Sequence, residues 1–270
     1  MSGKRLIITK KNSRRWAAVL CGLISLLLMA RVYGAEFCFS NTEKGRLEAV
    51  KEYAVEGEGE NRSTYGISHD TPVRAAAFAE REGWLYVFYT ADNEENTHGI
   101  LTLEKGINGK FRPVRSQEGP FPYYAGIWAT WLSLGEKGQE ALALAGENCE
   151  DIKGVRLDFS PEQQEGMEQN AGVTEHVYPI DTPDFLWILD GKALWGDRKI
   201  PPIFEKDVRF LDENGNDVTE KYRDEKVTGG WGSGKGSAEL WAVYAAVALI
   251  GFVGIVLVQY FLWEEKEEPS

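Results

Sequence analysis

The chain has 270 residues, of which 43% are hydrophobic and 12% aromatic, and its formal net charge at pH 7 is −12. The aromatic content excludes a disordered chain, because disordered chains lack the large apolar side chains whose burial offsets the entropy lost on folding. The charge is uneven: residues 1–35 contain seven basic and no acidic side chains, whereas residues 36–238 contain 37 acidic and 22 basic ones. An acidic surface repels phosphate, so we expect no nucleic acid among the partners.

The first 35 residues have the organisation of a secretory signal. A basic stretch, residues 1–15, precedes the apolar run Trp16–Ala30, which has the length of a signal-peptide hydrophobic region. We expect cleavage near Gly34 or Ala35, where small residues occur. The alternative is an uncleaved signal anchor, and both alternatives place the region that follows outside the cytoplasm.

Residues 36–227 are expected to form an extracytoplasmic, mainly β domain. Short apolar runs recur along it, separated by turn signals such as Asn108-Gly109, which favours a tight hairpin. This spacing is typical of an antiparallel sandwich or a barrel-like sheet. A break into two subdomains is considered near residues 119–122 or near residues 201–202.

The segment 36–71 is ambiguous between helix and strand, because its apolar residues fit both periods. Beyond it, the apolar runs predict strands in chain order at Trp84–Tyr89, Gly99–Leu103, Phe111–Val114, Ala141–Ala145, Val155–Phe159, Val173–Ile180, Phe185–Leu189, Lys192–Trp195, Val208–Leu211 and Val218–Tyr222.

The most apolar segment is Leu240–Trp263, which contains no charged residue. Its 24 residues would form a helix of about 36 Å, which is long enough to cross a hydrocarbon core of about 30 Å. Small residues recur at every third position from Ala242 to Gly254; we interpret them mainly as lipid-facing, with helix association as the alternative. A Gly/Ser-rich linker, residues 228–239, precedes this segment, and an acidic tail, residues 264–270, follows it.

The positive-inside rule predicts the orientation of the chain. The basic N-terminus stays in the cytoplasm, so the domain is extracytoplasmic and the C-terminal tail is cytoplasmic. We therefore expect a protein of the cell membrane, single-pass after signal cleavage and two-pass if the signal is retained.

The linker contains a glycine pattern, Gly229-x-x-x-x-Gly234-Lys235-Gly236, that departs from a phosphate-binding loop. The residue after the lysine should be Ser or Thr to reach Mg²⁺, and the following helix should be soluble rather than membrane-spanning. We therefore expect no nucleotide and no other cofactor.

Asp212, Asn214 and Asn216 alternate as oxygen ligands do in a calcium-binding loop. However, Asp217 and Arg223 stand where an EF-hand requires glycine and a bidentate glutamate. We expect a hairpin loop whose Asn and Asp side chains bond the backbone, with a weak Ca²⁺ site as the alternative. No other metal site is predicted.

The chain contains three histidines: His69, His98 and His176. None has the close spacing of zinc ligands, and neighbouring residues of an extended chain point in opposite directions, so Asp70 cannot orient His69 in a hydrolase triad. Glu80 and Glu82 are expected to share one strand face, but such pairs arise by chance in an acidic domain. The sequence therefore identifies no catalytic residue.

Cys38 and Cys149 are the two cysteines outside the apolar N-terminal segment. An oxidising exterior allows a disulfide between them. Cys149 follows polar residues in an expected loop, which is an unusual position for a cysteine that stays reduced. We expect a Cys38–Cys149 disulfide, to which the chain-entropy model assigns about 4–5 kcal/mol; the alternative is two thiols.

These features together predict a non-enzymatic, membrane-anchored module that binds or assembles with another envelope or membrane protein. The alternative is a cell-envelope hydrolase or transferase whose carboxylates converge only in three dimensions.

Overall fold

The computed structural model describes residues 10–55, 67, 70–92, 97–120, 127–134, 139–159, 174–191, 194, 208–222, 232–233 and 240–263. The chain divides into two compact units. The helix unit consists of residues up to Cys38, the segment Gly106–Lys110, and the residues from Ser237 onward. The sheet unit consists of Phe39–Lys105 and Phe111–Gly236.

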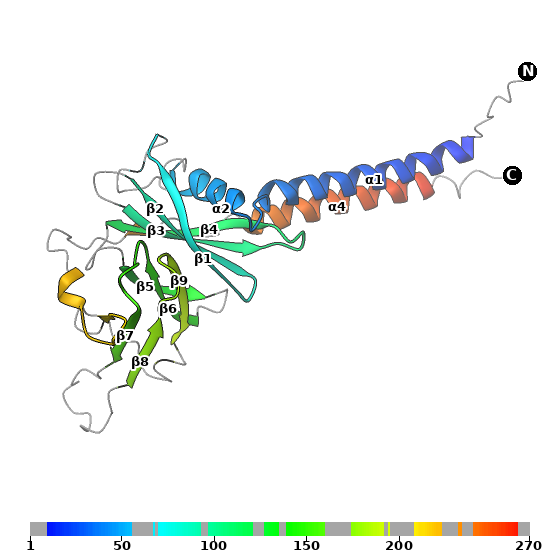
Figure 1. Cartoon of the computed structure of the whole chain (residues 1–270). Helices are drawn as coiled ribbons and strands as arrows, with labels where there is room; N and C mark the ends of the chain where they lie inside the picture. The colour runs from blue at the N-terminus through cyan, green and yellow to red at the C-terminus, as the bar shows by residue number, and fades with distance from the viewer. Residues whose placement is uncertain are drawn as a thin grey trace, which may run out of the picture. The chain divides into compact units, whose positions relative to one another are not determined.

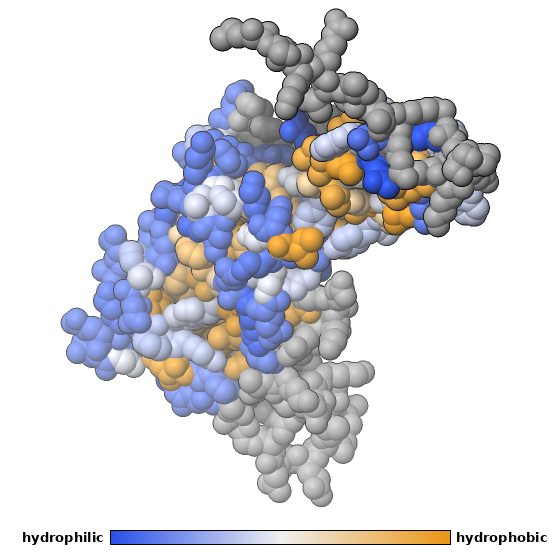
Figure 2. All heavy atoms as spheres, turned by 90° about the vertical axis from the view of Figure 1, so that its right-hand side faces the viewer, coloured by the Kyte–Doolittle hydropathy of each residue, from blue (hydrophilic) through white to orange (hydrophobic). Residues whose placement is uncertain are grey.

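Two long helices, α1 (Lys10–Glu36) and α4 (Leu240–Trp263), lie side by side in the helix unit (Figure 1). They are antiparallel, because a side chain at Gly22 would meet Val258, whereas one at Gly251 would meet Met29. Both helices are long and apolar enough to cross a membrane. Most of the exposed large hydrophobic side chains among the described residues belong to α1 and α4. Figure 2 shows hydrophobic side chains gathered at the upper right, beside the grey residues.

The packing face of α4 follows the helical repeat and not the stripe of small residues. Ala242, Ala245 and Ala248 are exposed, whereas Gly254 is buried. The residues of α4 with reduced exposure recur three or four positions apart, which is the period of a helix that packs along a single seam. The small residues at the C-terminal end of the stripe therefore contact α1, and those at its N-terminal end do not.

The sheet unit contains antiparallel strands in three sheets. Sheet A has the order β1-β2-β3-β4-β11, sheet B the order β5-β6-β9, and sheet C the order β10-β7-β8. The strands are β1 (Val73–Arg81), β2 (Trp84–Ala91), β3 (Thr97–Lys105), β4 (Phe111–Pro120), β5 (Ile127–Leu134), β6 (Gln139–Gly146), β7 (Gly154–Phe159), β8 (Thr174–Pro179), β9 (Phe185–Asp190), β10 (Val208–Leu211) and β11 (Gly232–Ser233).

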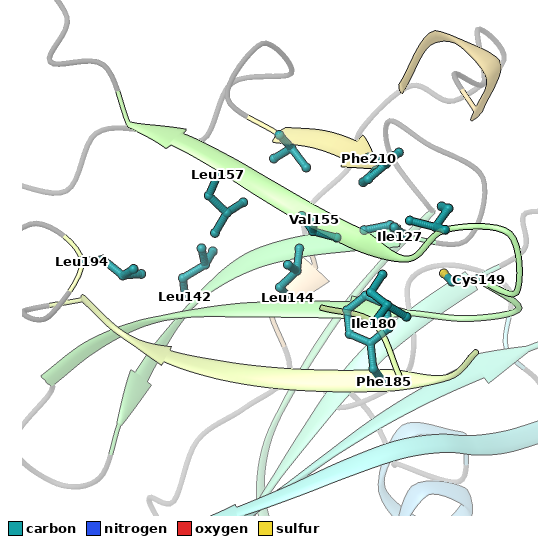
Figure 3. Packing of buried hydrophobic residues seen from close by; sticks show 12 residues of the cluster. Ile127, Leu142, Leu144, Cys149, Val155, Leu157, Ile180, Phe185, Leu194 and Phe210 are labelled. Atoms are coloured by element: carbon teal, nitrogen blue, oxygen red, sulfur yellow. The ribbon is translucent and has the colours of Figure 1, made fainter. Parts of the chain in front are cut away.

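Strand β6 shows how the sequence divides the core. Its alanines, of which Ala143 is one, pack with Tyr86 and Phe88 of sheet A, whereas Leu142 and Leu144 pack with sheet C. Successive side chains of a strand point to opposite faces, so the Ala-Leu alternation places small residues on one face and large ones on the other. Sheet B is therefore covered by a hydrophobic cluster on each face, and Figure 3 shows the cluster that contains the leucines.

A short helix, α2 (Glu43–Val50), begins the sheet unit and continues into the π-helical turn Lys51–Val55. Thr42 caps α2 by accepting a hydrogen bond from the backbone N–H of Gly45, at 3.1 Å. The segment 36–71 was ambiguous between helix and strand. Between residues 43 and 55 the structure is helical.

The fold is mixed α/β with antiparallel sheets, and the described strands do not close into a barrel, so the barrel-like alternative is wrong. Most expected strands are present, but residues 127–134 form a strand that the sequence did not predict. The expected strand at residues 218–222 is instead a 3₁₀ helix, Thr219–Tyr222. Of the expected strand Lys192–Trp195 only Leu194 lies among the described residues, so this strand stays a prediction.

Two residues of the expected linker, Gly232 and Ser233, form β11 and pair with Glu118 and Gln117 of β4. Three parts of the expected organisation lie outside the described residues: the other residues of the linker 228–239, the tail 264–270, and residues 1–9. The same holds for residues 201–202 and 121–122, so both positions considered for a subdomain break stay untested.

Candidate functional site

Three polar side chains form a row across the first three strands of sheet A. Arg74 on β1 pairs with Thr90 on β2, and Thr90 pairs with His98 on β3. Directly paired residues lie on the same face of a sheet, so this register brings the three side chains together. Thr90 and His98 are buried, whereas Arg74 is exposed at the edge strand.

Glu147 binds all three side chains of this row. Its Oε1 accepts a hydrogen bond from Thr90 Oγ1 at 3.2 Å and pairs with the Arg74 guanidinium. Its Oε2 lies 3.1 Å from His98 Nε2. Because an ionised carboxylate can only accept, we infer that Nε2 of His98 carries the proton and donates it to this bond.

Asp184, directly before β9, completes the site. Its Oδ2 accepts from Arg74 Nη1 at 2.6 Å, and its Oδ1 accepts from the backbone N–H of Asn148 at 3.0 Å. Asn148 has a φ of 54°, in the left-handed region that asparagine tolerates, so the chain bends immediately after Glu147. We call Arg74, Thr90, His98, Glu147 and Asp184 the Glu147 cluster.

The Glu147 cluster keeps its carboxylate ionised. Burial raises the pKa of Glu147, but the hydrogen bonds from His98 and Arg74 outweigh burial and lower this pKa to about 2. The hydrogen bond to Asp184 in turn raises the pKa of Arg74. The arrangement therefore clamps residues of sheet A to the two segments that flank β6 and β9 of sheet B.

Cys149 lies two residues beyond Glu147 and is only 3% exposed. It belongs to the hydrophobic cluster between sheets B and C, near Ile180 and Phe185 (Figure 3). Burial raises the pKa of its thiol to about 12, and the thiol donates to the carbonyl oxygen of Glu147 at 3.4 Å. Such a thiol stays protonated and is a poor nucleophile.

The expectation that Cys149 lies in a polar loop is therefore wrong for its side chain, although the neighbouring Glu150 and Asp151 are exposed. Cys38 is half-buried and belongs to the helix unit, whereas Cys149 belongs to the sheet unit. No disulfide joins them in the structure. The Cys38–Cys149 disulfide therefore stays a prediction.

Alkylation with a maleimide tests the state of Cys149. The folded chain is expected to leave Cys149 unmodified, because the thiol is buried and its pKa is raised to about 12. If no disulfide forms, denaturation without reductant should then expose a thiol that reacts fully, as mass spectrometry of the peptide would show. Modification that appears only after reduction would instead establish the disulfide.

The candidate calcium loop folds on its own hydrogen bonds. Asp212 Oδ1 accepts from the backbone N–H groups of Asn214 and Asn216 at 2.8 and 2.9 Å, and Asp212 Oδ2 accepts from Asn216 Nδ2 at 3.0 Å. These bonds lower the pKa of Asp212. The three residues are thus brought together as a turn, with Gly215 at a φ of 78°, which supports the interpretation as a hairpin loop.

The other acidic and histidine candidates lie apart from the Glu147 cluster. Glu80 accepts from Lys105 Nζ at 2.7 Å, whereas Glu82 lies in the turn between β1 and β2 with a φ of 51°. Glu82 is not on a strand, so the expectation of a shared strand face is wrong. His176 lies on β8 and stacks on Tyr178, and His69 lies outside the described residues.

Sequence reasoning missed the Glu147 cluster because its members are distant in the chain. The row of Arg74, Thr90 and His98 could have been found from a correct hairpin register, since each residue opposes the next. The approach of Glu147 depends on how sheet B packs on sheet A, and no local pattern encodes it. Among the described residues, no group of three or more His, Cys, Asp or Glu side chains is placed to hold a metal ion.

Acid titration should reveal the contribution of Glu147. Its pKa is lower in the folded chain than its ordinary value of 4.5, so its stabilisation is complete above about pH 4.5 and is lost as the pH falls towards 2. The loss is expected to reach about 3 kcal/mol. Denaturant unfolding at pH 5 and pH 2 measures it.

Glu147→Gln is the reference for this titration, because glutamine does not titrate. The difference in unfolding free energy between the native chain and this variant should shrink as the pH falls from 5 to 2. An equal difference at both pH values would show that Glu147 does not carry the acid sensitivity.

No protein-family model, curated protein or solved structure matches this chain.

Proposed function

We propose that the chain is a membrane-anchored module whose acidic domain, a stack of antiparallel sheets outside the cytoplasm, binds or assembles with another protein of the cell envelope. The proposal includes both apolar helices as membrane-spanning segments, with both termini in the cytoplasm. On this proposal the module is not an enzyme, and its partner is recognised by the surface of the domain.

The observation that carries the proposal is the Glu147 cluster. Glu147 accepts hydrogen bonds or an ion pair from three side chains, and Asp184 shares the same arginine. These titratable groups are thus used to hold sheets A and B together. Because these groups have a structural role, we expect a ligand to bind at the surface of the domain.

The alternative of a hydrolase or transferase has one observation in its favour, because Glu147 and Asp184 converge on Arg74. A general acid, however, needs a carboxyl group that stays protonated near neutral pH, which requires a raised pKa. The pKa of Glu147 is lowered to about 2. The convergence therefore favours a structural clamp over an acid and base pair.

The packing of α1 on α4 supports a retained signal segment. The cleavage site expected near Gly34 lies inside α1, where the backbone N–H of Phe37 donates to the carbonyl oxygen of Tyr33 at 3.0 Å. The rings of Tyr33 and Phe37 stack at 4.6 Å across the same position. Removal of α1 would also expose Gly254, the buried residue of α4.

Labelling of intact cells tests this topology. A membrane-impermeant cysteine reagent should reach a cysteine placed at Asn214 and miss one placed at Ser270. The mass of the purified chain should include residues 1–35. The reverse labelling pattern would contradict the orientation, and a mass that lacks residues 1–35 would contradict retention.

Photo-crosslinking in cells, with both helices intact, tests the function itself. A photoreactive amino acid would replace exposed residues of the sheet unit, Val177 on β8 and Glu213 in the turn after β10. A probe at Leu249 on α4 is the control for lipid-facing neighbours, because this side chain is also exposed. We expect one protein captured by a domain probe and absent at Leu249. Equal capture at all three positions, or none at the domain positions, would contradict a binding module.

A further inference from the structure

The turn between β3 and β4 carries the most exposed large hydrophobic side chain of the described residues, Ile107, at 95% exposure. This turn, Gly106–Lys110, belongs to the helix unit and not to the sheet unit. Its position is therefore defined relative to α1 and α4. The turn contains no acidic residue, and its Lys110 is exposed as well.

Three contacts fix the turn to the end of α1. The backbone N–H of Ile107 donates to the Tyr33 hydroxyl at 3.0 Å, and Asn108 Nδ2 donates to the carbonyl oxygen of Phe37 at 2.9 Å. Gly106 lies so close to the Phe37 ring that a Cβ atom there would come within 2.6 Å of it. The glycine permits this approach because it has no side chain.

The attachment point lies within the apolar span of α1. Residues Asn12–Glu36 are long and apolar enough to cross a membrane, and Tyr33 is in the last turn of that span. A span of 25 residues is about 38 Å long, which exceeds a hydrocarbon core of about 30 Å, so its ends reach the interface. A group bonded to Tyr33 therefore lies near the boundary between lipid and water.

The aromatic residues of α4 independently indicate that the end of α1 lies at the membrane interface. Met29 of α1 lies beside Gly251 of α4, and two helical turns further along the antiparallel pair Tyr244 lies level with Glu36. Tyr244 and Trp241 are both exposed, and aromatic side chains of this kind concentrate at membrane interfaces. The turn that carries Ile107 is thus level with the aromatic end of α4.

We propose that the turn Gly106–Lys110 is a lipid-contacting surface, with Ile107 inserted among the headgroups and upper acyl chains of the outer leaflet and Lys110 beside the phosphates. This inference rests on the proposed placement of α1 and α4 in the membrane. An exposed isoleucine and an exposed lysine in one turn suit binding to a membrane interface, since the apolar group enters the acyl boundary and the cation is attracted by anionic lipid.

Depth-dependent fluorescence quenching tests the surface. An environment-sensitive fluorescent amino acid would replace Ile107 in the full chain, reconstituted in bilayers of phosphatidylcholine and phosphatidylglycerol. Spin-labelled lipids would carry the quencher either near the headgroup or deep in the acyl chain. We expect stronger quenching at position 107 by the shallow quencher, and a shift of the emission to shorter wavelength relative to the chain in detergent-free denaturant.

The same probe at Leu26, an exposed residue in the middle of α1, separates the two proposals. Deep quenching at Leu26 with no lipid quenching at position 107 would overturn the lipid-contacting turn while leaving the membrane helices in place. Absence of lipid quenching at Leu26 would overturn the placement of α1 itself and, with it, this inference.

Discussion

Replacement of Glu147 by leucine is expected to lower the free energy of unfolding by about 2–3 kcal/mol, because it leaves two buried polar side chains without the acceptor that they share. His98 and Thr90 are buried and would lose their shared acceptor. Arg74 is exposed and can turn to water, so it adds less to the cost. Denaturant unfolding of the full chain in detergent, followed by tryptophan fluorescence, measures the change.

The matched control is Glu150→Leu, the same substitution at an exposed residue three positions along. It is expected to change stability by no more than about 0.5 kcal/mol. A double variant in which His98 is also replaced by leucine should recover part of the loss, because it removes the buried imidazole N–H that Glu147→Leu leaves without its acceptor. Equal losses for Glu147→Leu and Glu150→Leu would remove the structural role assigned to the Glu147 cluster.

The hairpins of sheet A were predictable because their signals are local. The aromatic run of β2 and the Asn108-Gly109 turn fix two antiparallel pairs, and Gly109 indeed has a positive φ of 74°. The turn at Glu82-Gly83 carries a similar signal, with φ angles of 51° and 82°, but its non-glycine residue is glutamate rather than the usual asparagine or aspartate. The expected strand through Glu82 is therefore wrong.

The failures in the second half of the sheet unit have a different cause. Strand β9 pairs with β6, whose residues lie 39 to 49 positions earlier in the chain. Local propensity cannot select among distant partners, and burial on both faces of sheet B decides the pairing. The same dependence on distant packing hides the Glu147 cluster and the burial of Cys149 from sequence reasoning.

The stripe of small residues in α4 does not by itself identify the face of the helix that contacts α1. A period of three drifts around a helix of 3.6 residues per turn, so one part of the stripe faces lipid and the other faces α1. The sequence alone could not show which small residues face lipid and which face α1, because the segment that forms α1 was expected to be removed. Ala18, Gly22 and Ser25 of α1 supply the complementary small side chains at spacings of four and three residues.

This close packing leads to the second large effect, at Gly254. A Cβ atom at this position would lie 2.4 Å from Ser25 Oγ and 2.7 Å from Ser25 Cβ, so any side chain must push the two helices apart. Apolar side chains gain little by associating within lipid, and helix pairs there depend on close contact through small residues. Gly254→Leu is therefore expected to abolish the stable α1–α4 pair, whereas the sheet unit keeps its fold.

A disulfide between cysteines introduced at Gly22 and Val258 reports on the pair, since a Cβ atom at Gly22 would lie 3.7 Å from Val258 Cγ2. With Cys21 replaced by alanine, oxidation in membranes should link the two helices, and proteolysis of the domain should release them as one fragment. Gly254→Leu should prevent the link. Ala248→Leu, the matched small-to-large change at an exposed position, should leave it intact. If both variants form the link equally well, the helices do not pack through Gly254, and the argument for a retained first helix loses its main support.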